Sequence, residues 1–309
     1  MFNIAAQGRI ILEHPASFFG AAEDGRIVVL SRQGEGTFLT PDLSILSRFS
    51  IANQPSGLAL SLDGLELAVT GADGISFYST STFEKTGYLN DAFLSCLYGS
   101  PDLFWTCSRF STQTAVLEVW NRGSKTRITK LKVGDPYGNS HFWVWPHPLA
   151  GSVVVWAAAG QDGQSLFWAT LDGDAIRLVR FRDLDFCSPP GFSPDGKEFL
   201  VPGEGELLRY AYPDGPLLGK MNKLPEDETI GDYVLYLDER RALLTSIEGR
   251  MFVVDVHEME VLDEAALDGP DLTFFLRMPG WRFLSVHRNW SGDHDQLMVW
   301  TATSALDGL

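Results

Sequence analysis

The sequence predicts an all-β protein, a single seven-bladed β-propeller of four-stranded antiparallel blades. Two observations support this fold class. Short runs of β-branched and aromatic residues recur along all 309 residues, and turns rich in glycine, aspartate and proline separate them. These runs group into units of about 40 residues, a repeat length typical of propeller blades.

The clearest unit covers residues 187–224. Its first turn, Ser193-Pro194-Asp195-Gly196-Lys197, is followed by an apolar strand, a Gly-Glu-Gly turn and a third strand ending near Tyr212. The spacing from the first turn to the second is nine or ten residues here, in the unit with Asp63-Gly64, and in the unit with Glu248-Gly249. Such agreement indicates one repeated meander of short strands.

Seven units fit the chain end to end and make residues 1–309 one domain. Their predicted starts lie near Ala16, Asn53, Asp91, Ser140, Phe186, Thr229 and Asp271. The last unit has only three evident strands, at residues 272–277, 282–287 and 296–301. Residues 8–13 belong to no unit, so we expect them to supply the outer strand of blade seven and close the ring.

The Asp-Gly turns and the third strands resemble those of seven-bladed propellers of the WD40 and YVTN types, over essentially the whole chain. Val119-Trp120 and Val299-Trp300 stand where WD40 strands place their tryptophan. The aspartate that follows this tryptophan in WD40 repeats, and their Gly-His dipeptide, are absent. The resemblance therefore implies a divergent WD40-like propeller and identifies no particular partner.

Composition and the N-terminal sequence indicate the cellular compartment in which the protein is expected. No run approaches 18 apolar residues, and the N-terminal sequence does not have the pattern of a secretory signal, so we expect a cytoplasmic protein. The turn at residues 100–103 predicts that Cys96 lies directly opposite Cys107. A strained cross-strand disulfide and two buried thiols are both compatible with that placement, and a reducing compartment favours the thiols.

The charge is strongly acidic and unevenly distributed. The net charge of −16 argues against a nucleic acid or an anionic membrane as the main partner. Residues 1–150 carry 11 basic and 13 acidic residues, whereas residues 151–309 carry 13 and 27. The second half is either a surface that keeps the protein soluble and monomeric, or an acidic face for a basic protein partner.

The longer loops are predicted at one face of the propeller, which we call the top. There the connections between blades meet the loops between second and third strands, and long loops on a rigid scaffold often carry function. We predict that a basic partner binds the acidic and aromatic residues of these loops. They are Phe110, Tyr137, Asp162, Asp185, Glu226, Asp227, Glu228, Asp232, Asp268, Asp271, Trp290, Asp293 and Asp295.

Signals for catalysis are few, and we expect no cofactor and no metal. Two histidines and two aspartates gather between His287 and Asp295, but they lack regular ligand spacing and suit a polar loop. The leading hypothesis is a non-catalytic scaffold for protein–protein interactions. The alternatives are a propeller enzyme, lactonase-like or another hydrolase, with a site at the axial pore, and a module that binds a small molecule or sugar.

Two further patterns carry structural predictions. Trp143 and Trp145 alternate onto one face of a strand, which we expect to pack in the core between blades. A basic run precedes and enters the outer strand of blade three: Arg122, Lys125, Arg127, Lys130 and Lys132. Charges on an outer strand discourage edge-to-edge pairing, and a small anion-binding patch is the alternative role.

Overall fold

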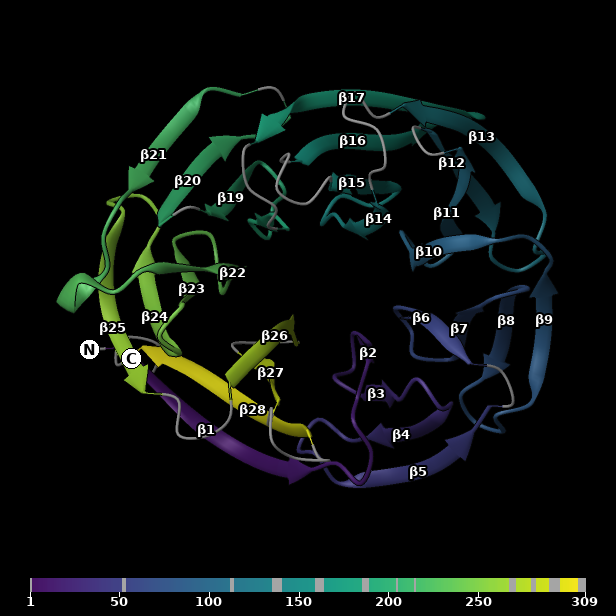
Figure 1. The fold of residues 1–309 in the computed structure, drawn as a ribbon, viewed down its shortest axis with the longest axis horizontal. Helices are drawn as coiled ribbons and strands as arrows, with labels where there is room; N and C mark the ends of the chain where they lie inside the picture. Colours follow the sequence, from purple (N-terminus) through teal and green to yellow (C-terminus); the bar gives the residue numbers. More distant parts are fainter. Residues whose placement is uncertain are drawn as a thin grey trace. The chain divides into compact units, whose positions relative to one another are not determined.

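The structure is a computed structural model. It describes residues 2–51, 54–111, 114–134, 141–158, 164–184, 189–203, 205–213, 215–266, 271–278, 282–288 and 295–304. These residues form seven four-stranded antiparallel sheets, as predicted, and the fold is a seven-bladed β-propeller (Figure 1). No helix in the described part of the chain has the length and apolar character needed to cross a membrane.

By its internal contacts the chain divides into two units. The first unit comprises Ala16–Thr40 and Ile45–Cys187 and contains blades one to four. Its strands are β2 (Phe18–Ala21), β3 (Ile27–Leu30), β4 (Glu35–Leu39), β5 (Ile45–Ser50), β6 (Pro55–Leu60), β7 (Glu66–Gly71), β8 (Gly74–Ser79), β9 (Lys85–Leu89), β10 (Phe93–Tyr98), β11 (Leu103–Ser111), β12 (Thr114–Asn121), β13 (Arg127–Gly134), β14 (His141–Pro146), β15 (Ser152–Ala158), β16 (Gln164–Asp172) and β17 (Ala175–Leu184).

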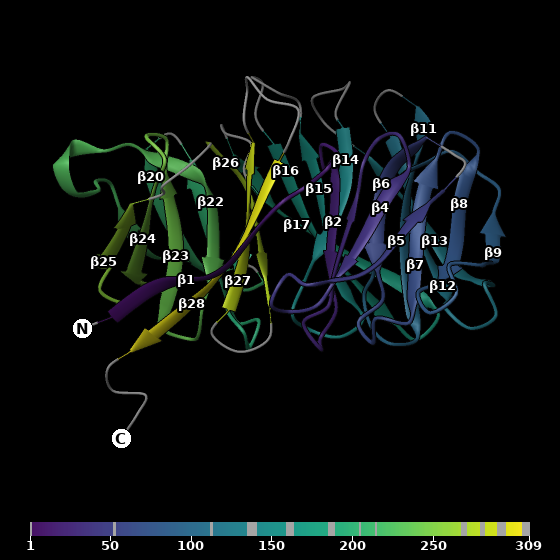
Figure 2. The same cartoon turned by 90° about the horizontal axis from the view of Figure 1, so that it is seen from below.

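The second unit comprises Met1–Pro15, Pro41–Ser44 and Ser188–Leu309 and contains blades five to seven. Its elements are β1 (Phe2–Ile11), β18 (Gly191–Phe192), β19 (Glu198–Gly203), β20 (Glu206–Ala211), β21 (Leu217–Met221), the 3-10 turn η2 (Pro225–Asp227), β22 (Ile230–Tyr236), β23 (Arg241–Ser246), β24 (Arg250–Asp255), β25 (Glu260–Ala266), β26 (Asp271–Arg277), β27 (Arg282–Arg288) and β28 (Asp295–Ser304). Within each unit the first strands of neighbouring blades are in contact. The strands of one blade lie side by side and extend from one end of that blade to the other (Figure 2).

The N-terminal strand completes blade seven, as the sequence predicted. β1 pairs with β28 in antiparallel register from Phe2 opposite Ser304 to Ile11 opposite Gln296, so that β28 lies between β1 and β27. The strand is longer at its start than residues 8–13 suggested, and it ends at Ile11. The buried Leu12 follows, and its N–H donates to the carbonyl of Asp295 at 2.9 Å.

The outer two strands of every blade share an irregularity that the repeat pattern did not reveal. Their pairing shifts register once in each of the seven sheets. In blades one to four and six, the turn joining the third and fourth strands contains a residue with positive φ: Leu43 (68°), Phe83 (56°), Lys125 (55°), Gly173 (59°) and Met259 (56°). Only one of these five is glycine, although the conformation favours it.

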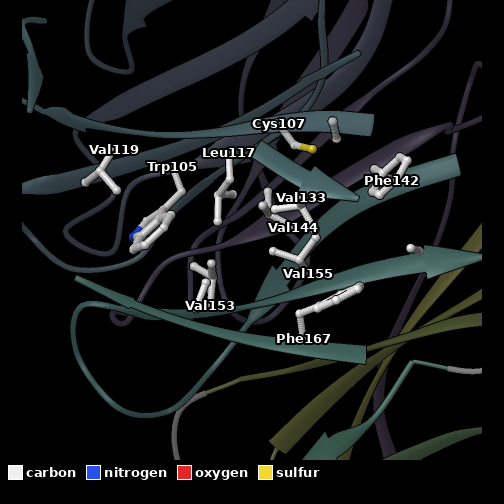
Figure 3. Close-up of a cluster of buried hydrophobic side chains, with 13 residues drawn as sticks. Trp105, Cys107, Leu117, Val119, Val133, Phe142, Val144, Val153, Val155 and Phe167 are labelled. Carbon is white, nitrogen blue, oxygen red and sulfur yellow. The ribbon is translucent and has the colours of Figure 1, made fainter. Parts of the chain in front are cut away.

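The core lies between blades. In the first unit, Trp105 and Leu117 of blade three pack with Val153 and Val155 of blade four (Figure 3). Because strand residues alternate between faces, each blade contributes one face of its sheet to each neighbour within a unit. Burying these apolar side chains stabilises the fold by roughly 1.5–3 kcal/mol for each large residue.

Blade four bears out the predicted alternation of its tryptophans. Trp143 and Trp145 share one face of β14, and the residues that join the core with blade three are Phe142 and Val144 on the other face. Trp143 is half-buried, and its ring centroid lies 4.9 Å from that of Trp156. Packing of the two tryptophans in a core between blades stays a prediction.

The tryptophans on third strands lie where the resemblance placed them. Trp120 donates from Nε1 to the hydroxyl of Thr106 at 2.9 Å, and Trp300 donates likewise to Ser285 at 2.7 Å. In both blades the acceptor lies on the second strand. Ser285 also bonds Nε2 of the buried His287 at 2.6 Å, so this histidine of the predicted polar loop lies inside blade seven.

The cysteine pair is also displaced from its predicted register. The β10–β11 turn sets Tyr98 opposite Phe104, and the register that continues from there places Cys96 opposite Thr106 and Cys107 opposite Ser95. Cys96 and Cys107 therefore point to opposite faces of blade three and join different core clusters. Both are free, buried thiols, and burial raises the pKa of each to about 12.

Candidate functional site

The structure places the predicted partner-binding residues in three groups. Those that lie outside the described residues are Tyr137, Asp162, Asp185, Asp268, Trp290 and Asp293. Three that the sequence assigned to loops belong to strands instead: Phe110 lies in β11, Asp232 in β22, and Asp271 begins β26. The remaining described residues are the acidic run Glu226–Asp227–Glu228, which lies between blades five and six, and Asp295.

Asp295 is not the exposed loop residue that the sequence suggested. It begins β28 opposite Arg288, and only 3% of its surface is exposed. Its carbonyl accepts the N–H of Leu12, where the N-terminal strand ends. A buried strand residue is not available to a partner, so Asp295 leaves the candidate site.

The acidic run forms a tight turn, and the residue that precedes the turn is buried in the core. Leu224 is buried in the core shared by blades five and six, and Pro225 begins η2. Glu226 and Asp227 have φ values of 58° and 59°, and the N–H of Glu228 donates to the carbonyl of Pro225 at 3.2 Å. Two consecutive residues in the left-handed region are costly, and they hold neighbouring carboxylates on different sides of the turn.

Arg250 holds two of the three carboxylates. This residue begins β24, and its Nη1 donates to Oε2 of Glu226 at 2.8 Å and to Oε1 of Glu228 at 2.6 Å. Its Nη2 pairs with Glu264 on β25. These carboxylates, Glu228 first, raise the pKa of Arg250 above its usual range. A second link ties the turn to blade six, because the N–H of Thr229 donates to Glu248 at 3.1 Å.

The three acidic residues therefore have different surroundings. The side chain of Glu228 is only 10% exposed and its Oε2 is buried without a hydrogen-bond partner among the described residues, whereas the side chain of Glu226 is 74% exposed. The side chain of Asp227 is 91% exposed, and the ion pair that it makes with Lys223 is loose at 3.7 Å. Glu228 is thus a structural residue, and Asp227 presents its charge to solvent.

This end of blades five and six is acidic overall. The basic side chains there are Lys220, Lys223 and Arg250. The acidic ones are Glu206, Glu226, Asp227, Glu228, Asp232, Glu248 and Glu264. The excess of carboxylates remains after the ion pairs are formed, because Arg250 alone faces three of them. A rigid surface of this charge attracts cationic groups.

The opposite ends of the blades contain two cavities at equivalent seams. One, of about 380 Å³, lies between blades two and three and is lined by Glu66, Thr86, Pro101, Asp102, Arg122, Gly123 and Lys125. The other, of about 360 Å³, lies between blades five and six and is lined by Asp195, Lys197, Glu198, Glu239 and His257. Sequence reasoning missed both, because each combines turns from two successive blades.

The charged groups at the first cavity bind one another. Lys125 Nζ lies 2.6 and 2.7 Å from the two carboxylate oxygens of Glu66, and the Tyr98 hydroxyl donates to the same residue at 2.8 Å. Arg122 binds both oxygens of Asp63 at 2.8 and 3.0 Å and holds the pKa of that carboxyl well below its usual range. This arrangement joins blades two and three.

The charged groups at the second cavity also bind one another, but within blade five. Arg209 binds both oxygens of Glu198 at 2.7 and 2.8 Å, and Lys197 pairs with Asp195 at 2.6 Å, which lowers the pKa of Asp195 to about 2. Sites for organic ligands are mostly apolar and have a few unpaired polar groups. Cavities lined by mutually paired charges fit that description poorly.

The described part of the chain contains no group of three histidine, cysteine or acidic side chains that could hold a metal ion. The cluster between His287 and Asp295 is divided there, since its two end residues are buried in β27 and β28 and residues 289–294 lie outside the description. His147, which follows β14, accepts the N–H of Leu149 through Nδ1 at 3.0 Å, and burial lowers its pKa to about 4.

Comparison with known proteins gives the fold and no closer relationship. No protein-family model matches the chain, and no curated protein matches its sequence. Among solved structures, the chain is similar to the β-propeller domain of Cps50 (Swd1) from Myceliophteria thermophila, with a TM-score of 0.70 and 8% sequence identity. The match covers 97% of this chain and 100% of that one. The chain thus has a WD40-like propeller fold.

Proposed function

We propose that the protein is a non-catalytic scaffold whose acidic surface on blades five and six binds a basic segment of a partner protein. The observation that carries the proposal is the turn at Glu226–Glu228. Its backbone is fixed by Arg250 and the buried Leu224, and Asp227 projects its carboxylate into solvent. Propellers of this fold commonly serve as scaffolds for protein interactions, which is consistent with such a surface.

Rigidity supports binding rather than mere solubility. A surface that only keeps a protein soluble needs charge and no fixed geometry, whereas this turn holds two residues in the left-handed region. A preorganised carboxylate loses little conformational entropy when a partner binds. The proposed partner presents lysine or arginine side chains, and the surrounding carboxylates accelerate its approach.

The kinetics of association test the proposal. Partner proteins captured from a native lysate would be measured by surface plasmon resonance against the wild type and Asp227→Lys. We expect Asp227→Lys to slow association about threefold to tenfold at low salt and less at 0.5 M salt, because exposed charges are screened. The matched control is Asp174→Lys, which makes the same charge change at an exposed turn of blade four.

The alternatives have distinct outcomes. Equal association rates for the wild type and both variants at every ionic strength would mean that the acidic surface keeps the protein soluble and does not bind a partner. Equal slowing by both variants would show that net charge, rather than this turn, governs the encounter. Glu228→Lys is unsuitable for the test, because it would replace the buried carboxylate that pairs with Arg250 by a second cation and so disturb folding.

An aromatic anchor completes the proposal. Trp290 belongs to a predicted loop that lies outside the described residues, and Asp293 follows it in the same loop. Tryptophan at the centre of an interface contributes about 2 kcal/mol or more. We expect Trp290→Ala to raise the dissociation rate and to leave the association rate nearly unchanged, which separates its role from that of Asp227.

A further inference from the structure

The cavity between blades five and six is built from the same positions as the cavity between blades two and three. Each adjoins an aspartate in the turn after the first strand, a glutamate that begins the second strand, and a tyrosine that ends the first strand of the next blade. These residues are Asp63, Glu66 and Tyr98 at the first cavity, and Asp195, Glu198 and Tyr236 at the second. The two cavities can therefore be compared position by position.

Arg122 contacts all three groups at the first cavity. Its Nη1 and Nη2 donate to the carboxylate of Asp63 at 2.8 and 3.0 Å, and Nη1 also donates to the carbonyl of Pro101 at 3.2 Å. Its Nε lies 3.5 Å from Glu66, and its guanidinium carbon lies 5.5 Å from the ring centroid of Tyr98. One arginine of blade three thus satisfies the acidic groups of blade two.

The second cavity lacks a counterpart of this guanidinium. Val256 stands at the position of Arg122, since each residue directly follows the third strand of its blade and donates its N–H at 2.8 Å to the turn between the first two strands. Val256 is fully buried in the core. Consequently, no described side chain of blade six forms an ion pair with Asp195.

Two carboxylates at the second cavity are already paired within blade five, one firmly and one loosely. Arg209, whose side chain is 9% exposed, binds both oxygens of Glu198. Asp195 pairs with Lys197, whose side chain is 80% exposed. An exposed pair of this kind contributes little stability, so an incoming cation can compete for Asp195.

A third carboxylate at the second cavity is not paired. Glu239 occupies the position of Pro101, because the turns between first and second strands have the same length in the two blades. Within the described part of the chain Glu239 forms no ion pair, and Arg277 of blade seven interacts with it only at longer range. Desolvation and the neighbouring carboxylate of Asp195 raise the pKa of Glu239. This carboxylate therefore lacks the cation that would neutralise it.

A buried hydroxyl at the second cavity also lacks a partner. At the first cavity, Tyr98 donates to Glu66 at 2.8 Å. The hydroxyl of Tyr236 interacts electrostatically with Glu198 and Glu239, two of the residues that line the second cavity. It forms no hydrogen bond with any residue that the structure describes, although only 1% of Tyr236 is exposed. Leaving a buried hydroxyl unpaired costs free energy, which a ligand that bonds it would recover.

We propose that the cavity between blades five and six receives the side chain of an arginine from a partner protein, in the place that Arg122 fills between blades two and three. The N–H groups of the guanidinium would donate to Asp195, Glu239 and the hydroxyl of Tyr236. Sites for small molecules are mostly apolar, whereas the lining of this cavity is charged and suits a side chain presented by another protein. The site lies at the end of the blades opposite to Asp227, so it does not depend on the function proposed above.

Fluorescence anisotropy with defined peptides tests the proposal on the full-length protein. The probe is a fluorescein-labelled peptide with one central arginine among glycine and serine residues, and lysine or citrulline replaces the arginine in two control peptides. At 0.15 M salt we expect the arginine peptide to bind at least about fivefold more tightly than the lysine peptide, because only the guanidinium offers a planar fork of donors. The citrulline peptide retains the shape without the charge and should bind more weakly still.

Protein variants locate the site. Glu239→Gln should weaken binding of the arginine peptide about fivefold, and Tyr236→Phe should weaken it about twofold to threefold. Tyr236→Phe should not lower the stability of the free protein, because its hydroxyl has no partner to lose. Glu258→Gln is the matched control: it removes an exposed carboxylate from the β24–β25 turn of the same blade and should leave the affinity unchanged. Asp227→Lys, at the other end of the blades, should also leave it unchanged.

Val256→Arg supplies the guanidinium from the chain itself. Arg122 shows that an arginine at this position reaches the carboxylates of the preceding blade. We expect the variant to fill the cavity and to bind the arginine peptide at least about tenfold more weakly than the wild type. Circular dichroism would verify that each variant is folded, and Glu239→Gln and Tyr236→Phe decide the question if Val256→Arg does not fold.

Four results would overturn the proposal. An arginine peptide that binds no more tightly than the lysine peptide would mean general attraction of cations. Equal weakening by Glu239→Gln and Glu258→Gln would place the effect outside the cavity. A folded Val256→Arg variant with the affinity of the wild type would have the same meaning. Agmatine that binds at least about tenfold more tightly than the peptide, measured by competition, would identify a small guanidino compound as the ligand.

Discussion

Replacing Lys125 by methionine should destabilise the protein, and Phe77→Arg should cost less stability in that variant than in the wild type. The reason is a correspondence between two seams. Phe77 lies opposite Gly87, and Lys125 of the next blade reaches over both to Glu66. At the seam of blades five and six, Arg209 lies opposite Gly219, Met259 packs over that glycine, and Arg209 itself binds the carboxylate of Glu198.

Phe77 and Arg209 thus occupy equivalent positions at the two seams, and so do Lys125 and Met259. The cation and the apolar side chain have exchanged places between the two seams. Met259 has a φ of 56° and Lys125 a φ of 55°, so methionine is compatible with the backbone at position 125. Lys125→Met leaves Glu66, whose side chain is 16% exposed, without its closest cation. Breaking a fully buried pair costs 3–5 kcal/mol, and partial exposure reduces the expected loss here to about 2 kcal/mol.

Phe77→Arg alone should cost at least as much, because it places a second cation beside Lys125 at a fully buried position. In the double variant the guanidinium can bind Glu66 as Arg209 binds Glu198. We expect the double variant to be more stable than the sum of the two single changes predicts, by at least about 1 kcal/mol.

Urea unfolding followed by tryptophan fluorescence would measure all three variants, with thermal unfolding as a second probe. Lys85→Met is the matched control: it removes an exposed lysine from the outer strand of blade two, the blade of Glu66 and Phe77, and should change stability by less than about 0.5 kcal/mol. Strictly additive effects of Phe77→Arg and Lys125→Met would refute the correspondence between the seams.

Three further predictions concern pH, thiols and the N-terminal strand. The pKa of Asp63 is lowered by its hydrogen bonds from Arg122, so this carboxylate stabilises the fold above pH 3.8 and progressively less as the pH falls below it. Compared with the wild type, Asp63→Asn should have a lower urea midpoint at pH 6 and a smaller change in midpoint between pH 6 and pH 3. A pH profile parallel to that of the wild type would contradict this role. Cys96 and Cys107 should react with a thiol reagent only after unfolding, because both are buried with pKa values near 12; rapid modification of the native protein, or a mass that reports a disulfide, would be the contrary result. Deletion of residues 2–11 should lower the melting temperature and promote aggregation, because it exposes the backbone edge of β28. The described side chains of β1 are exposed or half-buried, so the expected effect comes from the lost strand pairing. An unchanged melting temperature would show that this strand contributes little.

The sequence predicted the architecture because strand length, turn residues and repeat spacing are local properties. Asp63-Gly64 and Asp195-Gly196 form the predicted turns, in which Ser61 and Ser193 donate to the aspartates at 2.6 and 2.8 Å. The N-terminal strand was predicted from an equally simple observation, that blade seven lacked a partner for its third strand. Neither conclusion required knowledge of which side chains touch.

The differences arose where the pattern was symmetric or where a turn fixed the register. Both faces of β14 are apolar, so alternation could not show that Phe142 and Val144, rather than Trp143, enter the core with blade three. The β10–β11 turn sets Tyr98 opposite Phe104, which places the cysteines one residue away from the predicted pairing. Nothing in the local sequence marks Lys125 as a residue of positive φ that lies over the preceding blade, because that conformation favours glycine.

The candidate site was located only in part, for a related reason. Glu226, Asp227 and Glu228 look equivalent in the sequence, and distant residues distinguish them. Arg250 is 22 residues beyond Glu228, and it binds two carboxylates of the run and leaves the third exposed. The sequence could therefore identify an acidic segment but not the carboxylate that is available to a partner.

The proposed surface at Asp227 should respond to salt in two stages, and this response tests the proposal. A basic ligand there is attracted by the local carboxylates and by the net charge of −16, so its association should slow steadily as salt rises. At 0.01 M salt, where the Debye length is about 30 Å, the attraction acts from the whole molecule; at 0.15 M, about 8 Å, only the nearby carboxylates remain effective. The ratio of the association rates of the wild type and Asp227→Lys should therefore remain above one at 0.15 M salt and approach one at 1 M, measured by surface plasmon resonance. A ratio that already equals one at 0.15 M would mean that the net charge, rather than this turn, attracts the ligand.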